Sequence, residues 1–163
     1  MGDAYRVRGG VGPELPGLVG PAGVDGRADW VPVVRSGAEL LEVLEARLGS
    51  EVDVDKIVLG VLAPLASTLD GAPLGALVAH LPLHLARELA QPDLALNTRV
   101  RAPRGAGDYL LEVSRLIQHP PPCAASYVRA VFAVAGRAVS RADAEAIAAR
   151  LPADLAALWR SAR

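Results

Sequence analysis

The sequence has few of the features that mark a secreted, membrane-spanning or strongly charged protein. It contains one cysteine, Cys123, so no disulfide can form within the chain and a reducing compartment is expected. Its longest apolar run, residues 57–66, is too short to cross a bilayer, and its first residues do not form a signal peptide. The net charge of -1 gives no overall field that would draw nucleic acid or an anionic membrane. We therefore expect a cytoplasmic protein with no membrane partner, and we disfavour nucleic acid as its partner.

Aromatic residues are also scarce, at 4% of the chain, although hydrophobic residues make up 52%. The core must then be filled mainly by Leu, Val and Ala, and both Leu and Ala favour helix. A chain of 163 residues is long enough to bury roughly two thirds of its unfolded surface. The composition therefore predicts a helical protein of one domain or of two small domains packed together.

Glycine and proline concentrate in the first 35 residues, which hold half of the chain's 16 glycines. Such a composition cannot form a regular helix and predicts a Gly/Pro-rich extended arm over residues 1–35. Within the arm, Trp30 and Val33 offer apolar area beside Pro32, which forbids helix. We expect this part of the arm to dock on another surface.

Helix signals recur from Ser36 onward. Ser36 followed by Glu39 forms a capping box, and leucines at helical spacing come after it. Ser140 followed by Asp143 gives the same signal nearer the end of the chain. Asp53 or Asp55 can cap the next helix, which we expect to bend near Pro64. Two more helices are expected before residue 91, which gives four helices in this part of the chain.

An internal duplication is the strongest pattern in the sequence. Leu-Leu-Glu-Val at 40–43 recurs at 110–113, and Leu-Pro at 81–82 recurs at 151–152. With the same displacement and no gap, Gly37 falls on Gly107 and Val58 falls on Val128. Such a repeat indicates two copies of one unit that bury their apolar faces against each other. We predict an all-α fold of two tandem four-helix units packed as a pseudo-two-fold pair. The first repeat covers residues 36–91, a linker covers 92–106, and the second repeat covers 107–163.

The repeats resemble a known family. Tyr-Val-Arg-Ala-Val-Phe at 127–132, Val-Ser at 139–140, Ala-Arg-Leu-Pro at 149–152 and Leu-Trp at 158–159 are similar to the second half of the bacterial domain-of-unknown-function family 2267. The first repeat, with Leu65, Leu69 and Leu-Pro at 81–82, is similar to the less regular first copy of that family. The resemblance covers about residues 36–162. It implies a helical, cytoplasmic protein and carries over no catalytic residues, because the family has no established activity.

Groups that could carry chemistry are few and have simpler explanations. His80 and His84 have the spacing of two metal ligands on one helix face, but Pro82 between them marks a helix boundary. Cys123 follows three prolines at a helix start, where a thiol can be activated, and we favour instead a small apolar residue that fills a packed helix start. We find no catalytic triad, metal cluster or phosphate loop. The sequence therefore predicts no cofactor, no metal site and no enzymatic activity.

The helix expected over residues 54–69 is apolar almost all round, whereas its counterpart in the second repeat keeps a polar face. A helix that is apolar on every side must be covered, either by the second repeat, by the arm or by another protein chain. We hypothesise a docking or self-association face that includes Trp30, Val33, Leu59 and Leu83.

These patterns favour a non-enzymatic helical interaction module, an adaptor or a subunit of a larger bacterial assembly. Its partner would be another protein or a second copy of the chain. One alternative is a regulatory nucleic-acid-binding protein that uses arginines of the linker and the second repeat, namely Arg99, Arg101, Arg104, Arg129, Arg137 and Arg141. Another is a carrier of an apolar ligand, which predicts an apolar cavity between the repeats.

Overall fold

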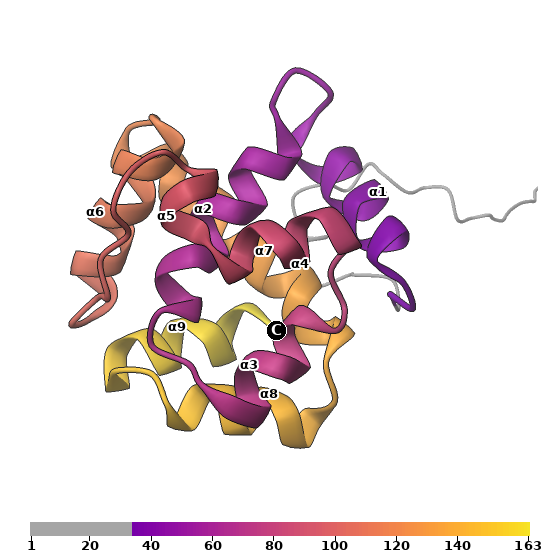
Figure 1. Cartoon of the computed structure of the whole chain (residues 1–163), viewed down its shortest axis with the longest axis vertical. Coiled ribbons are helices and arrows are strands. Elements are labelled where there is room, and N and C mark those ends of the chain that lie inside the picture. The colour runs from indigo at the N-terminus through magenta and orange to yellow at the C-terminus, as the bar shows by residue number, and fades with distance from the viewer. Residues whose placement is uncertain (1–33) are drawn as a thin grey trace, which may run out of the picture. The chain divides into compact units, whose positions relative to one another are not determined.

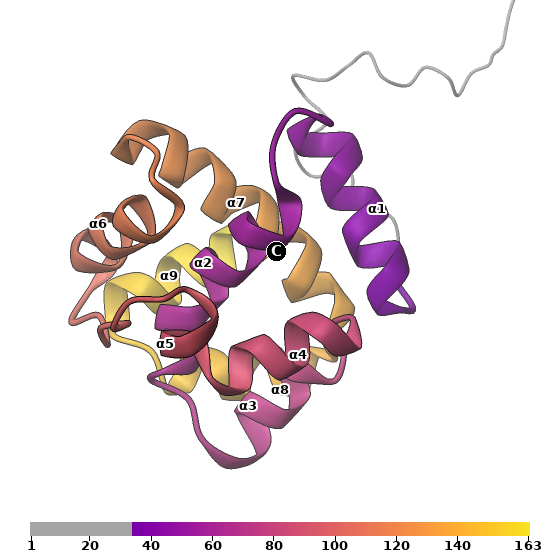
Figure 2. The ribbon, with the colours of Figure 1, turned by 45° about the horizontal axis from the view of Figure 1, so that its top comes forward.

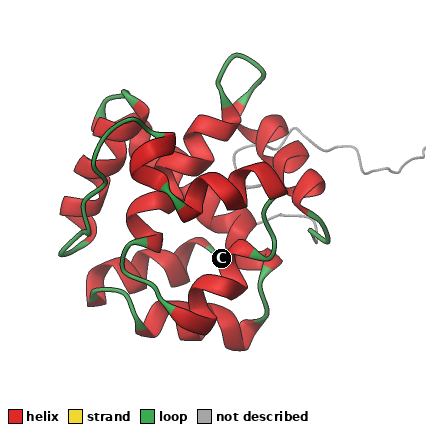
Figure 3. Cartoon of the chain, viewed as in Figure 1, coloured by secondary structure: helices red, strands yellow, loops and turns green. Residues whose placement is uncertain are grey.

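The computed structural model describes residues 34–163, which form α-helices joined by short connections (Figure 1). No strand occurs in this part of the chain (Figure 3), and the predicted all-α fold class is confirmed. None of the described helices is long and apolar enough to cross a membrane. In chain order the helices are α1 (Gly37–Leu48), α2 (Val54–Ala66), α3 (Gly71–Val78), α4 (Leu83–Ala90), α5 (Pro92–Ala95), α6 (Ala106–Ile117), α7 (Pro121–Ala138), α8 (Arg141–Ala149) and α9 (Ala153–Ala162).

Serine caps begin α1 and α8 where the sequence predicted them. The Ser36 hydroxyl oxygen accepts the amide of Glu39 at 3.2 Å, and the Ser140 hydroxyl oxygen accepts the amide of Asp143 at 3.0 Å. The carboxylate of Glu39 in turn accepts the amide of Arg35 at 3.0 Å, one residue earlier than in the predicted capping box. Each serine cap stabilises its helix by about 1 kcal/mol, which fixes where the two helices start.

The two halves of the chain share one core. α1 packs on α7 of the second half, and α6 packs on α2 of the first half. α2 and α7 also contact each other, and α3 lies against α8 (Figure 2). Residues 34–163 therefore belong to one compact unit. α5 and an extended stretch occupy the residues that the sequence assigned to a linker. The pseudo-two-fold relation between the halves stays a prediction from the sequence.

α1 and α6 are the first helices of the two predicted repeats. Their buried residues correspond with a shift of one residue from the gap-free alignment. Leu40 of α1 is 1% exposed, and the residue at its position along α6 is the fully buried Tyr109. The gap-free alignment paired Leu40 with Leu110, which is only partly buried. Val58 and Val128, which the same alignment pairs, are both buried. The matching tetrads at 40–43 and 110–113 therefore do not occupy matching positions.

Three of the chain's few aromatic residues meet in the core. The ring centroids of Tyr109 and Phe132 lie 5.8 Å apart, and Trp159 meets Phe132 edge-on at 5.2 Å. All three side chains are fully buried, and the indole nitrogen of Trp159 donates to the Ala144 carbonyl at 3.0 Å. This cluster joins α6, α7 and α9, and the rest of the core is aliphatic, as the composition predicted.

α2 and α6 approach each other closely at Gly60. A Cβ atom at this position would lie 2.4 Å from Cγ2 of Ile117, so only glycine fits without displacing α6. Pro64 lies inside α2, where it removes the N–H that would bond to the Gly60 carbonyl. The close contact places the start of α2 beside the end of α6, and a groove opens there.

Candidate functional site

A surface groove of about 670 Å³ lies among the described residues. One wall comes from the first turns of α2 together with Glu88 of α4. The other walls are the stretch that follows α5 and the last turn of α6. We call this hollow the α2/α6 groove, and both halves of the chain contribute to it.

The α2 wall carries charged side chains that are held by neighbouring elements. Asp53, and not Asp55, caps α2: its Oδ1 accepts the amide of Lys56 at 3.2 Å. Oδ2 of Asp55 lies 2.9 Å from Nε2 of His84 on α4. Lys56 is the only lysine of the chain, and its ammonium donates to Oε1 of Gln118 at 2.9 Å. The last bond ties the start of α2 to the end of α6 across the groove.

Two residues with left-handed backbone conformations line the groove. Asn97 has φ 53° and Gln118 has φ 60°, and no other non-glycine residue among residues 34–163 has a positive φ. Asparagine adopts this conformation more readily than most other non-glycine residues. For glutamine the conformation costs roughly 1–2 kcal/mol, which a glycine would avoid. The Gln118 side chain offsets part of this cost through its bond with Lys56.

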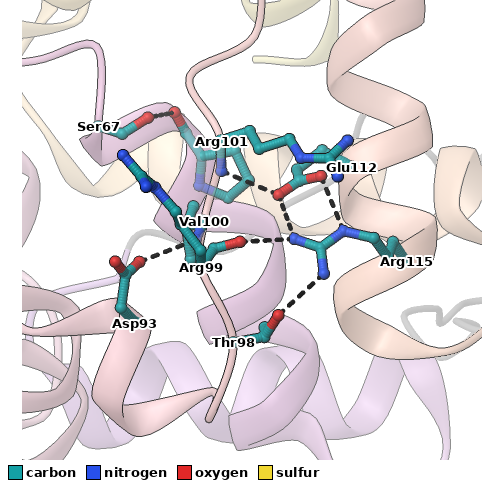
Figure 4. A network of polar contacts seen from close by, with 9 residues as sticks. Ser67, Asp93, Thr98, Arg99, Val100, Arg101, Glu112 and Arg115 are labelled. Carbon is teal, nitrogen blue, oxygen red and sulfur yellow. Dashed lines mark hydrogen bonds and ion pairs between the residues drawn. The ribbon is translucent and has the colours of Figure 1, made fainter.

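An ion pair between a buried carboxylate and a half-exposed arginine fixes the wall that follows α5 (Figure 4). Glu112 of α6 is 5% exposed, and its carboxylate receives Nε of Arg115 at 3.0 Å and Nη2 at 2.6 Å. The same guanidinium donates to the Thr98 hydroxyl at 3.0 Å and to the Arg99 carbonyl at 2.7 Å. The amide of Arg101 donates to Glu112 at 2.9 Å. These bonds fix residues 98–101 on the surface of α6.

The ion pair also sets the charge state of Glu112. Burial by itself raises the pKa of this carboxyl, but the hydrogen bonds from Arg115 and from the amide of Arg101, with the positive charges of both, outweigh burial. The net result is a pKa below the ordinary value, so Glu112 is ionised at neutral pH. The fork between Arg115 and Glu112 is a geometry that carboxylates favour.

The groove as a whole is left with an excess of negative charge. The charge of Arg115 is neutralised by Glu112 beneath it. The remaining charged groups of the lining are three carboxylates, Asp53, Asp55 and Glu88, and one ammonium group, Lys56. The field in the groove therefore favours a positively charged group.

The four residues predicted for a docking face do not form one surface. Leu59 is 6% exposed and lies at the base of the α2/α6 groove, because α1, α4, α6 and α7 cover the apolar helix α2 from within the chain. The expectation of an open face around Leu59 is thus corrected. Leu83 is 67% exposed at the start of α4 and does not line the groove. Trp30 and Val33 lie outside the described residues.

Cys123 is exposed, and this corrects the interpretation that it fills a packed helix start. Its neighbour Ala124 takes the buried position instead. The two histidines do not lie on one helix, because His80 is in the turn after α3 whereas His84 is on α4, where it contacts Asp55. Within residues 34–163 no group of three or more His, Cys, Asp or Glu side chains is arranged to hold a metal ion.

A family model covers the groove entirely. The model of a family described as uncharacterized conserved protein (DUF2267) matches residues 38–158. The chain belongs to the DUF2267 family. This confirms the resemblance that the sequence showed, and no curated protein and no solved structure matches the chain. Every described residue that lines the groove lies inside the DUF2267 match. Bacterial origin, cytoplasmic location and duplication stay predictions.

Sequence reasoning missed the polar residues of the groove. Glu112 and Arg115 have the three-residue spacing of a helical ion pair, which was a usable signal, but nothing in the pattern showed that Glu112 is buried. Asn97 and Gln118 carry no local signal, because their positions matter only when α6 lies on α2. The exposed Leu94, at 75%, was assigned to a linker.

Proposed function

We propose that this DUF2267 protein is a non-enzymatic helical interaction module that binds a segment of a partner protein in the α2/α6 groove. The observation that carries the proposal is the groove itself, whose walls come from both halves and are held by the pair of Arg115 with the buried Glu112. A partly polar groove beside exposed leucines is the kind of surface that binds a protein segment.

The lining of the groove supports binding rather than catalysis. Covalent catalysis requires a nucleophile within hydrogen-bond reach of a base. Among the described residues that line the groove there is no serine or cysteine, and the Thr98 hydroxyl accepts a bond from Arg115. Lys56, the other side chain of the lining that could act as a nucleophile, donates to Gln118.

The edges of the groove offer apolar contacts to a partner. Leu94 of α5 is 75% exposed and directly precedes Ala95, which lines the groove. Leu111 is 62% exposed and lies one helical turn before Arg115 on α6. Two large exposed leucines next to a groove favour a protein partner, whose segment would bury both. The charged and amide side chains of the lining disfavour the carrier of an apolar ligand.

Site-specific photo-cross-linking tests the proposal. We would replace Leu111 with the photoreactive residue p-benzoylphenylalanine and irradiate the cells that make the protein. We expect one discrete protein adduct. Ala95→Trp, which fills the groove at an exposed position, should abolish the adduct, and Ala79→Trp, at an exposed position outside the groove, should leave it unchanged. Lack of an adduct, or an adduct that survives Ala95→Trp, would contradict the proposal.

A second candidate is nucleic-acid binding at a smaller hollow, of about 380 Å³, between α1 and α7. Arg47 and Arg129 line it together with Tyr127, whose ring meets His119 edge-on at 5.3 Å. Arginines beside an aromatic ring suit a nucleic acid with exposed bases. A titration with single-stranded DNA at increasing salt decides this: steep loss of affinity supports it, and no binding at low salt rejects it.

A further inference from the structure

We infer that the α2/α6 groove takes a partner segment in which a lysine or arginine side chain stands beside an apolar residue. The inference rests on the proposed function, since it names the chemistry of the partner at that groove. Three features of the groove carry it: an acidic wall, an apolar base and two amide side chains at the turns that border it.

The acidic wall is continuous from α2 to α4. Asp55 of α2 lies 2.9 Å from His84, and Glu88 follows His84 by one turn of α4 on the same helix face. Asp53 lies on the same wall at the start of α2. The Glu88 carboxylate forms no hydrogen bond or ion pair with any residue in 34–163, and its side chain is exposed, so it is available to a partner.

The cations of the groove do not neutralise this wall. The Lys56 ammonium donates to Gln118, and the Arg115 guanidinium forks onto Glu112 and onto the stretch after α5. Lys56 keeps its charge but is the one cation of the lining left against three carboxylates, because Arg115 is paired with Glu112, so an anionic partner segment would meet a net negative charge. A cationic side chain gains from them, and such complementarity contributes specificity and association rate.

The apolar base suits the stem of a long basic side chain. Leu59 and Leu116 are 6% and 5% exposed, and Leu96 is partly buried beside them. Lysine and arginine lay their methylene stems on such surface and keep the charged end in water. A neighbouring apolar residue of the segment would cover Leu94 or Leu111, which are the exposed leucines next to the groove.

Two amides are placed to bind the main chain of the segment. Oε1 of Gln118 accepts from Lys56, so its NH₂ group remains for another acceptor. The Asn97 side chain forms no hydrogen bond with any other described residue. An extended peptide presents alternating N–H and C=O groups to such side chains, and these bonds orient it in the groove.

A display selection tests the chemistry. The probes are random peptides of about ten residues, which span roughly 33 Å when extended, selected against the full chain. Peptides bound in the groove are recognised because they protect Lys56, the single lysine, from acetylation, as read by mass spectrometry, and because Ala95→Trp abolishes their binding. The charge is tested with Glu88→Lys, matched by Glu42→Lys at an exposed position of α1 outside the groove.

We expect the groove-binding peptides to share a basic residue next to an apolar one. Glu88→Lys should weaken them about tenfold, with little change for Glu42→Lys, and their affinity should fall as salt rises. Groove-binding peptides that lack a basic residue, or equal losses in the two variants, would overturn this inference and leave the proposed function standing. Recovery of no peptide that Ala95→Trp displaces would overturn both.

Discussion

The hydroxyl group of Tyr109 on α6 donates a hydrogen bond of 2.6 Å to the main-chain carbonyl of Val61 on α2. Tyr109 is fully buried, so neither group can bond to water instead. The bond lies next to Gly60, whose carbonyl lacks its helical partner because Pro64 has no N–H. Tyr109 of the second half thus supports the turn of α2 in which a helical hydrogen bond is missing.

Removal of this hydroxyl should destabilise the whole fold. We expect Tyr109→Phe to lower the free energy of unfolding by about 1–2 kcal/mol, because the Val61 carbonyl loses a buried partner. Urea denaturation measures the change. Tyr127→Phe is the matched control: Tyr127 is half-buried and its hydroxyl bonds to no described residue, so its loss should have little effect. Equal effects would show that the Tyr109 bond contributes nothing particular.

Tyr109 should also make stability fall at alkaline pH. Burial raises its pKa well above the ordinary value of 10.0, so the folded chain keeps the phenol protonated while the unfolded chain ionises. The contribution of this group to stability is complete below pH 10 and is lost as the pH rises from there toward the pKa of the folded state. Denaturation curves between pH 9 and pH 11 should show this slope, and Tyr109→Phe should reduce it.

Neutralising Glu112 should loosen the wall that follows α5. Glu112→Gln removes the carboxylate charge that holds the half-exposed guanidinium of Arg115. We expect the free energy of unfolding to fall by about 2 kcal/mol. Hydrogen exchange at the amide of Arg101, which donates to Glu112, should become faster. The control is Glu145→Gln, because the exposed pair of Glu145 with Arg160 should leave stability nearly unchanged.

The ion pair of Glu112 with Arg115 should also affect the stability of the fold at acid pH. The pKa of Glu112 is lowered from its ordinary value of 4.5. The ionised carboxylate therefore stabilises the fold fully above pH 4.5, and this stabilisation is lost as the pH falls through the pKa of the folded state. Glu112→Gln should therefore flatten the fall of stability below pH 4.5. An unchanged acid profile in the variant would mean that other carboxylates cause the fall.

Replacing each of the two leucines of the predicted docking face with aspartate should show which of them is buried, because only a buried site should lose much stability. Leu59→Asp places a charge among buried residues and should lower the free energy of unfolding by about 3 kcal/mol or more. Leu83→Asp changes a side chain that is 67% exposed and should cost less than about 0.5 kcal/mol. Thermal unfolding followed by circular dichroism compares them. Comparable losses in both would contradict the burial of Leu59.

The sequence predicted the elements of this fold better than their contacts. Ser36 and Ser140 cap helices as expected, and periodic leucines form the core, because such signals act within a few residues. The α2/α6 groove was not predictable in the same way. It needs the end of α6 beside the start of α2, and Gly60 permits that contact through the absence of a side chain. Local patterns do not report such packing.

The register of the two first helices is a second case in which the pattern misled. Identical tetrads at 40–43 and 110–113 aligned without a gap, yet Leu44 and Val113 are the buried counterparts, because α1 begins at Gly37 and α6 begins at Ala106. An alignment scores identical letters, whereas burial depends on which face of the helix meets the core. One residue rotates a helix by about 100°, so the difference decides which side chains are buried.

Alanine at two glycines tests this register directly. The gap-free alignment pairs Gly37 with Gly107, and equivalent positions should respond alike. A Cβ atom at Gly37 would lie 2.4 Å from the main-chain nitrogen of Pro82, which cannot move aside as a flexible side chain can. We expect Gly37→Ala to lower the free energy of unfolding by roughly 2–3 kcal/mol. A Cβ atom at Gly107 would meet no atom within 4 Å, so Gly107→Ala should raise stability by about 0.5–1 kcal/mol through its helix propensity. Urea denaturation measures the change in the free energy of unfolding for both variants. Changes of opposite sign support the shifted register, and equal losses support the gap-free alignment.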